Sequence, residues 1–217
     1  VQRVDDVDGA PRFAMLETVR EFGLEKLAGS GQEKRVRQAH AAHFRALAEG
    51  ARESLAGEDQ PAWLSRLEDE RGNLRAAIAF AASENDAETA LSLVASLFWF
   101  WYLRGHYREG RMLLDRVLAR FPDAPEKSRL PALLSSGSLA FLTCDYGRAE
   151  MLLAEAAELA RALSDKTALA SALRYLGSLS RERGDVERAL ALHEESGQLS
   201  DEQGDVRLAL REQIAHD

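Results

Sequence analysis

The stretch LLSSGSLAFLTCDYGRAEMLLAEAAELA (residues 133–160) decides the fold, because it returns 40 positions later as LRYLGSLSRERGDVERALALHEESGQLS (residues 173–200). The residues that recur at this constant offset are Leu133, Gly137, Ser138, Leu139, Asp145, Arg148, Ala149, Glu155 and Leu159. Each copy has apolar residues at three- and four-residue spacing on both sides of a turn, which predicts two helices. Pairs of helices repeated at a fixed period stack on one another, since no single pair can bury its own apolar face.

Small residues within the repeat indicate where its two helices cross. Gly137 and Gly177 fall mid-helix, where glycine costs about 1 kcal/mol relative to alanine, so we expect close packing to require them. Ala149 and its counterpart Ala189 are predicted to face the same joint from the second helix. Gly184-Asp185 is predicted to end one helix and cap the next.

The helical pattern extends in both directions from the repeat. Turn signals at intervals of about 17 to 22 residues are Asn85-Asp86, Gly105-His106, Phe121 to Pro125, Cys144-Asp145, Ser164-Asp165, Gly184-Asp185 and Gly204-Asp205. The last of these begins a further, truncated repeat. Upstream, residues 33–55 and 61–82 are predicted to form two longer helices, the second opened by Pro61.

Only the N-terminal segment departs from the helical pattern. Residues 2–6 and 12–16 alternate apolar and polar side chains around Asp8-Gly9, which predicts a short β-hairpin. Residues 17–28 are then predicted to form a helix with Leu16, Val19, Phe22 or Gly23, and Leu27 along one face. We therefore predict two domains, residues 1–30 and residues 31–217, in an otherwise all-α fold.

Composition excludes several classes of function. The net charge of -8 argues against DNA binding through a general basic surface. The single cysteine, Cys144, rules out an internal disulfide and a cysteine-based zinc site, which fits a cytoplasmic location. No apolar run approaches the roughly 18 residues that span a bilayer, so no membrane association is expected. A start at Val1 suggests a piece excised from a longer protein.

The repeat resembles the tetratricopeptide repeat, through Leu176-Gly177, the Gly184-Asp185-Val186 turn and Ala189. This resemblance implies a right-handed superhelix of antiparallel helical hairpins. Four upstream segments, RFAMLETVREFGLEKL, RQAHAAHFRALAE, WLSRLEDERGNLRAAIAFA and FWYLRGHYREGRMLLDRVL, resemble the region after the nucleotide-binding module of bacterial STAND-class signalling ATPases, which are often LuxR-type or other transcriptional regulators. Such proteins carry an NTPase module, a winged helix and a helical-repeat sensor. The resemblance implies that residues 1–30 end the winged helix and that the sensor follows.

No residue of this chain can be assigned to catalysis or cofactor binding. The sequence has no GxxxxGK[ST] phosphate loop, so ATP is expected only in an upstream module, and no complete helix-turn-helix, so direct nucleic-acid binding is not expected. His40 and His43 stand three apart on a helix, but without an obvious third ligand the favoured interpretation is two half-buried helix histidines. No nucleophile motif is present. We expect neither an enzyme nor a metal site.

The aromatic stretch FWFWYLRGHYREG (residues 98–110) is the strongest candidate for binding. In the repeat register, Leu97, Phe98 and Trp101 are predicted to pack inside a helical pair, while Trp99 and Tyr102 line a concave groove. The predicted groove residues are Trp99, Tyr102, Ser138, Leu142, Arg174, Ser178 and Arg181. Their passage from aromatic to basic suits an anionic or amphipathic effector, or a peptide with an acidic end. The alternative for the arginines is a solvated face with local ion pairs.

Two functions remain open at this point. The chain is either a ligand-sensing region that controls an ATPase of the same protein, or a constitutive scaffold for a partner protein. The winged-helix resemblance favours the first. Its expected partners are a protein segment or small effector in the groove and the protein's own nucleotide-binding module.

Overall fold

A computed structural model describes residues 2–5 and 11–202 of the chain, which form helices apart from two short strands. The chain divides into two compact units, Val1–Ser96 and Leu97–Asp217, and each is described by itself. Within the described residues, no helix is long and apolar enough to cross a membrane.

The first unit begins with two antiparallel strands, β1 (Gln2–Asp5) and β2 (Pro11–Ala14), in which Arg3 pairs with Phe13. The connection between them, where Asp8-Gly9 is predicted to turn, lies outside the described residues. Helix α1 (Glu17–Gly29) follows and contains no buried residue. Three of the apolar residues expected along one face, Leu16, Val19 and Phe22, are exposed, because no described helix packs closely on that face.

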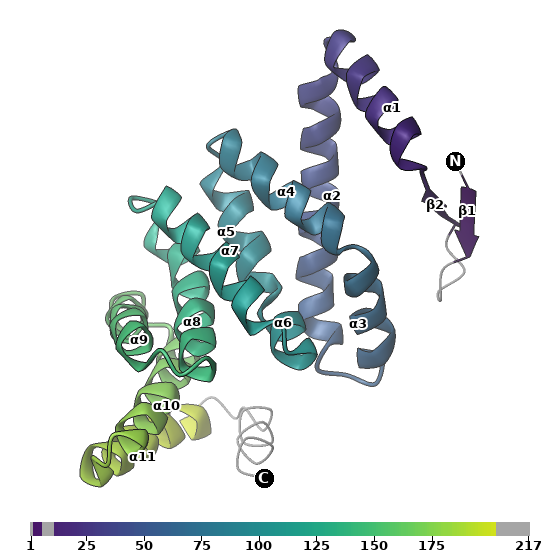
Figure 1. Cartoon of the computed structure of the whole chain (residues 1–217). Helices are drawn as coiled ribbons and strands as arrows, with labels where there is room; N and C mark the ends of the chain where they lie inside the picture. The colour runs from purple at the N-terminus through teal and green to yellow at the C-terminus, as the bar shows by residue number, and fades with distance from the viewer. Residues whose placement is uncertain (1, 6–10, 203–217) are drawn as a thin grey trace. The chain divides into compact units, whose positions relative to one another are not determined.

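Four further helices complete the first unit: α2 (Glu33–Ser54), α3 (Gln60–Asp69), α4 (Arg71–Ser83) and α5 (Ala87–Ser96) (Figure 1). Helix α2 packs against both α4 and α5, and Phe44, Leu74 and Leu91 are among the buried residues of this core. The single helix predicted over residues 61–82 is instead two helices. The break falls at Glu70, two positions before Gly72, which is a weak helix former.

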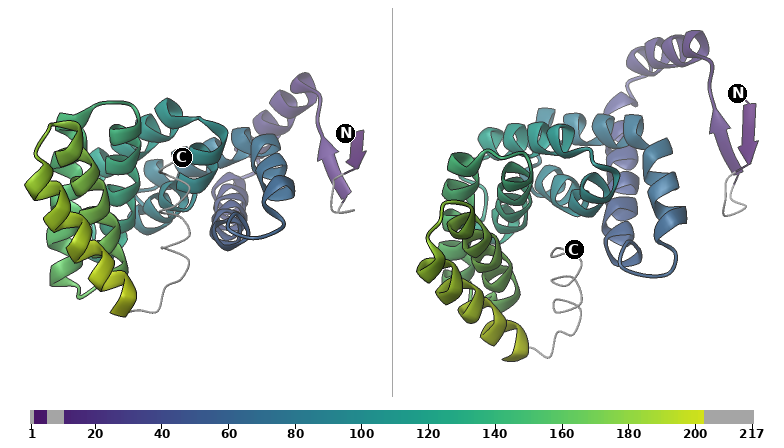
Figure 2. Two further views of the ribbon diagram at one scale, coloured as in Figure 1. Left: turned by 90° about the horizontal axis from the view of Figure 1, so that it is seen from below. Right: turned by 60° about the horizontal axis from the view of Figure 1, so that its bottom comes forward.

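The second unit consists of successive helices: α6 (Phe98–Arg104), α7 (Tyr107–Arg120), α8 (Glu126–Leu142), α9 (Tyr146–Ala162), α10 (Lys166–Glu182) and α11 (Val186–Glu202). Helices α8 to α11 lie side by side in chain order, each pair joined by a tight turn (Figure 2). Small residues allow this packing, since Ala140 and Ala149 are fully buried between α8 and α9. The predicted close crossings at Gly137 and Gly177 are confirmed: an added Cβ would lie 2.7 Å from Cγ of Leu153 and 2.9 Å from Nε2 of His193, respectively.

The turns between these helices share one local structure. Cys144, Ser164 and Gly184 all have positive φ angles, of 59°, 55° and 82°. The aspartate that follows each of them caps the next helix, as when the Asp165 carboxylate accepts a hydrogen bond of 2.9 Å from the backbone N–H of Ala168. The predicted Gly184-Asp185 turn is confirmed, because the Asp185 carboxylate accepts from the N–H of Arg188.

Candidate functional site

The aromatic helix α6 has one buried face. Leu97, Phe100 and Trp101 are 2%, 1% and 1% exposed. Phe98, which we predicted to lie in the core, is only half-buried, and Phe100 occupies the core in its place. The reason is helical geometry: positions 97, 100 and 101 lie together on one side of a helix, whereas position 98 lies at the margin of that side, next to position 102.

The other face of α6 carries a cluster of half-buried rings. The ring of Tyr102 stacks on Phe98, with centroids 6.0 Å apart, and contacts the edge of Trp99 at 5.4 Å. The ring of Tyr107, at the start of α7, lies 6.2 Å from Tyr102. Trp99 and Tyr102 therefore lie together outside the core, as the repeat register predicts.

Helix α10 carries a cation and a ring that contact each other. The guanidinium of Arg174 lies over the ring of Tyr175, 4.4 Å from its centroid. Burial raises the pKa of the Tyr102 phenol; the phenols of Tyr175 and Tyr107 add to the rise, and the Arg174 charge opposes it. Groups on α10 therefore contribute to the pKa of Tyr102 on α6. We call Tyr102, Tyr107, Arg174 and Tyr175 the α6–α10 cluster.

The predicted groove residues differ in how exposed they are. Trp99, Tyr102, Leu142, Arg174 and Ser178 are half-buried and so partly accessible. Ser138 is only 3% exposed, which corrects its assignment to the groove. Its helix, α8, is the central one, with α7, α9 and α10 all packed against it.

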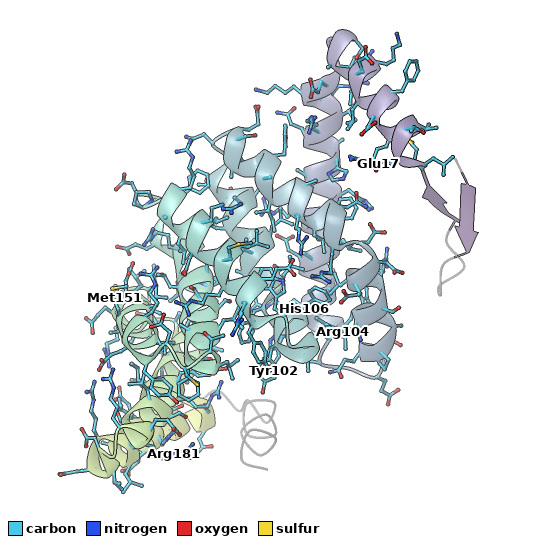
Figure 3. The ribbon with its side chains drawn as sticks, viewed as in Figure 1. Glu17, Tyr102, Arg104, His106, Met151 and Arg181 are labelled. Carbon is cyan, nitrogen blue, oxygen red and sulfur yellow. The ribbon has the colours of Figure 1, made fainter. Side chains whose placement is uncertain are left out.

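Arg181 is exposed near the C-terminal end of α10, and its guanidinium lies 3.9 Å from the Glu182 carboxylate (Figure 3). Its surroundings match the solvated-face alternative. Sequence reasoning missed Tyr107 and Tyr175 in the cluster. Tyr175 directly follows Arg174, so its position beside a predicted groove residue was the available signal.

A pocket of about 390 Å³ lies in the first unit, at the junction of α2, α4 and the start of α5. It is lined by Lys34, Gln38, Ala41, Ala42, Arg45, Ala46, Glu49, Phe80, Ala81, Glu84, Asp86 and Thr89. No groove residue predicted from the sequence belongs to it. The signal that could have indicated it is the run of alanines on α2, whose small side chains leave room beside the neighbouring helices.

Several charged side chains around this pocket form ion pairs. The Lys34 ammonium lies 2.5 Å from the Glu84 carboxylate, and Arg45 donates to Glu49 at 2.8 Å. The hydroxyl of Ser92 also donates to Glu49, at 2.6 Å. These two hydrogen bonds, that from Arg45 first, lower the pKa of the Glu49 carboxyl. A ligand in this pocket would have to compete with pairs that are already formed.

The two histidines on α2 flank an aromatic ring. The ring centroids of His40 and His43 lie 4.6 Å and 5.0 Å from that of Phe44. His40 is half-buried as predicted, whereas His43 is exposed. Across residues 2–5 and 11–202, no group of three or more His, Cys, Asp or Glu side chains is arranged to hold a metal ion.

Comparison with known proteins finds sequence similarity to bacterial transcriptional regulators. No family model matches it. It is 39% identical over 114 residues to the protein named "Putative HTH-type transcriptional regulator Rv0890c" of Mycobacterium tuberculosis, and equally to the Mycobacterium bovis protein named in the same way with the designation Mb0914c. The similar region covers 52% of this chain and only 13% of either relative. The similarity is to transcriptional regulators far longer than this chain.

Proposed function

We propose that this chain is the regulatory helical-repeat region of a multidomain bacterial transcription regulator. The observation that carries the proposal is the 39% identity over 114 residues to HTH-type transcriptional regulators, of which the similar region is a small part. A region of this kind regulates by binding, and catalysis, ATP and DNA contact belong to other modules of the same cytoplasmic protein.

Features of the second unit support a tetratricopeptide-like superhelix as the form of this region. The turn in which a residue of positive φ precedes a capping aspartate recurs at Cys144, Ser164 and Gly184. Glycines stand at close helix crossings in both α8 and α10. A stack of equivalent helical hairpins requires the same turns and the same close crossings at a fixed spacing.

The N-terminal elements support the end of a winged-helix domain. Helix α1 exposes large apolar side chains, among them Leu16 at 66% and Phe22 at 58%. A two-stranded sheet is only marginally stable in water without a third partner. An apolar helix face beside such a sheet is what the edge of a larger domain presents when its remainder is absent.

Under this proposal, an effector or a partner segment binds the second unit and changes how the region docks on the nucleotide-binding module. The half-buried rings and the cation of the α6–α10 cluster are the surface that supports this role, since aromatic residues and arginine dominate binding energy at recognition surfaces. STAND-class ATPase control is the mechanism that we infer from the family resemblance.

A transcriptional reporter tests this function. The promoter of the protein's own gene drives the reporter in cells that produce either the full-length protein or a variant lacking residues 31–217. We expect the deletion to change transcription several-fold while promoter binding, measured by mobility shift, persists. Unchanged transcription, combined with loss of a co-purifying partner protein, would instead support the constitutive scaffold.

A further inference from the structure

We propose that the pocket of the first unit binds a small organic cation, a primary ammonium group on a short apolar chain. The pocket lies where α2, α4 and α5 pack on one another (Figure 1). In this proposal Asp86 pairs with the ammonium, and alanine side chains of α2 contact the apolar chain. The inference goes beyond the proposed function, because that function places its effector on the second unit.

The shape of the pocket suits an extended apolar chain. Its lining follows α2 from Lys34 to Glu49, about 22 Å of helix at 1.5 Å per residue. Alanine is the commonest residue of this wall, and Ala42 and Ala46 are exposed, so their small side chains leave the pocket open to solvent. Helix α4 contributes the half-buried ring of Phe80. A volume of about 390 Å³ lies at the lower end of the range for small-molecule sites, which fits a ligand of a few linked carbons.

The charged side chains that line the pocket are paired, with one exception. The Lys34 ammonium lies 2.5 Å from the Glu84 carboxylate. The Arg45 guanidinium donates to the Glu49 carboxylate at 2.8 Å. Asp86 is the exception, so the unmatched charge of the pocket is negative and a cation complements it. A ligand that pairs with Asp86 displaces neither of the existing pairs.

The helix that follows Asp86 holds its carboxylate in place. Its Oδ1 accepts a hydrogen bond of 3.0 Å from the backbone N–H of Thr89, in the first turn of α5. Among residues 2–5 and 11–202, no cation lies within ion-pair distance of Asp86, and Oδ2 accepts no hydrogen bond. An ammonium can donate to this oxygen and to the Thr89 hydroxyl, which lines the same pocket. The helix N-terminus carries only about half a positive charge, less than the full negative charge of the carboxylate.

The lining favours an organic cation over a metal ion. In the part of the chain that the structure describes, no group of three or more His, Cys, Asp or Glu side chains is arranged to hold a metal. Hard cations such as Mg²⁺ and Ca²⁺ need several oxygen ligands, which alanine methyl groups and the Phe80 ring do not supply. The same apolar groups can contact methylene carbons, and the face of an aromatic ring attracts an ammonium. The lining therefore matches an ammonium joined to a carbon chain rather than a bare ion.

Calorimetric titration of the 217-residue chain tests the inference with hexylammonium as the probe. Two matched compounds separate its chemistry: 1-hexanol keeps the chain without the charge, and methylammonium keeps the charge without the chain. We expect saturable binding of hexylammonium, and binding at least about tenfold weaker for either analogue. Loss of one charged hydrogen bond, or of several buried methylene groups, accounts for a change of that size.

Two aspartate variants with the same capping role locate the charge. Asp86→Asn removes the negative charge but keeps the cap, because asparagine caps a helix about as well as aspartate. It should weaken hexylammonium binding about tenfold or more. Asp165→Asn is the matched control, since the Asp165 carboxylate caps α10 in the same way but lies outside the pocket. It should change binding less than about twofold.

Two alanine variants on α2 locate the apolar chain. Ala46→Leu places a larger side chain in the pocket and should weaken hexylammonium binding about tenfold. Because Ala46 is exposed and leucine is a good helix former, the thermal melt should stay close to that of the parent chain. Ala39→Leu is the control, at an exposed position of the same helix that does not line the pocket, and should leave binding unchanged.

Several outcomes would overturn the inference. These are the absence of saturable binding up to millimolar hexylammonium, equal binding of 1-hexanol, or equal losses in Asp86→Asn and Asp165→Asn. A lysine-containing peptide that binds more tightly than hexylammonium would reassign the pocket to a protein partner. The reporter experiment is independent, so failure of the titration with a positive reporter would reject only the cation site in the first unit.

Discussion

Gly110 of α7 leaves the space that the Trp101 indole of α6 fills. A Cβ added at Gly110 would lie 2.7 Å from Cγ of Trp101, closer than real side-chain contacts allow. In the following helical pair, the equivalent positions are Ala140 and Ala149, both fully buried. The first crossing of the unit is therefore built from one very large and one absent side chain, and the second from two small ones.

This relationship predicts that Gly110→Ala destabilises the chain by about 1–3 kcal/mol through overpacking, although alanine is the better helix former. Urea denaturation would measure the change. Gly147→Ala is the matched control, since Gly147 also lies in a helix but an added Cβ there would meet no atom within 4 Å. If both variants are equally stable, the Trp101–Gly110 contact does not control packing at this crossing.

The two tryptophans of α6 should differ in their contributions to stability. Trp101 is 1% exposed, so Trp101→Ala should cost about 3–5 kcal/mol, as large core truncations do. Trp99 is half-buried beside Tyr102, and Trp99→Ala should cost much less. Thermal melts of the two variants would measure this difference. Equal destabilisation would show that the whole aromatic stretch is core.

The turn residues with positive φ predict opposite effects for glycine and alanine. Cys144 has a φ of 59°, a conformation that an L-residue adopts at a cost, so Cys144→Gly should stabilise the chain by about 0.5–1 kcal/mol after the entropy cost of glycine. Gly184 has a φ of 82°, and Gly184→Ala should be destabilising by about 1 kcal/mol. Denaturation midpoints would test both, and a Cys144→Gly variant below the parent in stability would contradict this account.

Acid should weaken the connection between α7 and α9. The pKa of the Asp145 carboxyl is lowered below its usual value of 3.8, first by the hydrogen bond from the Arg111 side chain and then by that from the Arg148 backbone N–H. A lowered folded-state pKa stabilises the fold above the unfolded value, and this contribution is lost as the pH falls through the folded value. We therefore expect stability to fall below about pH 4.

Arg111→Met should reduce this acid dependence. The measurement is the denaturation midpoint between about pH 6 and pH 3 for the parent chain, for Arg111→Met and for Arg116→Met, a control at an exposed position of the same helix. The slope should become shallower only in the Arg111 variant. An identical slope in all three proteins would rule out this pair as a source of the pH dependence.

Much of the helical organisation could be predicted because its causes are local. The turn at Gly184-Asp185 follows from the conformational freedom of glycine and from a side-chain hydrogen bond three residues along the chain. The crossing at Gly177 follows from the repeat, since a glycine that recurs mid-helix has a packing reason. By contrast, the division near Glu70 depends on small differences in helix propensity, which a continuous apolar pattern does not reveal.

The sequence by itself determined the helical repeat, its turns and the aromatic character of α6, because periodicity, capping and glycine conformation act within a few residues. Only the tertiary structure decided that Phe100 rather than Phe98 is core, that Ser138 is covered, and that the rings of Phe141 and Tyr175 meet. It also decided that the apolar residues of α1 are not buried. Burial depends on which distant helices pack against a residue, and no local pattern specifies those neighbours.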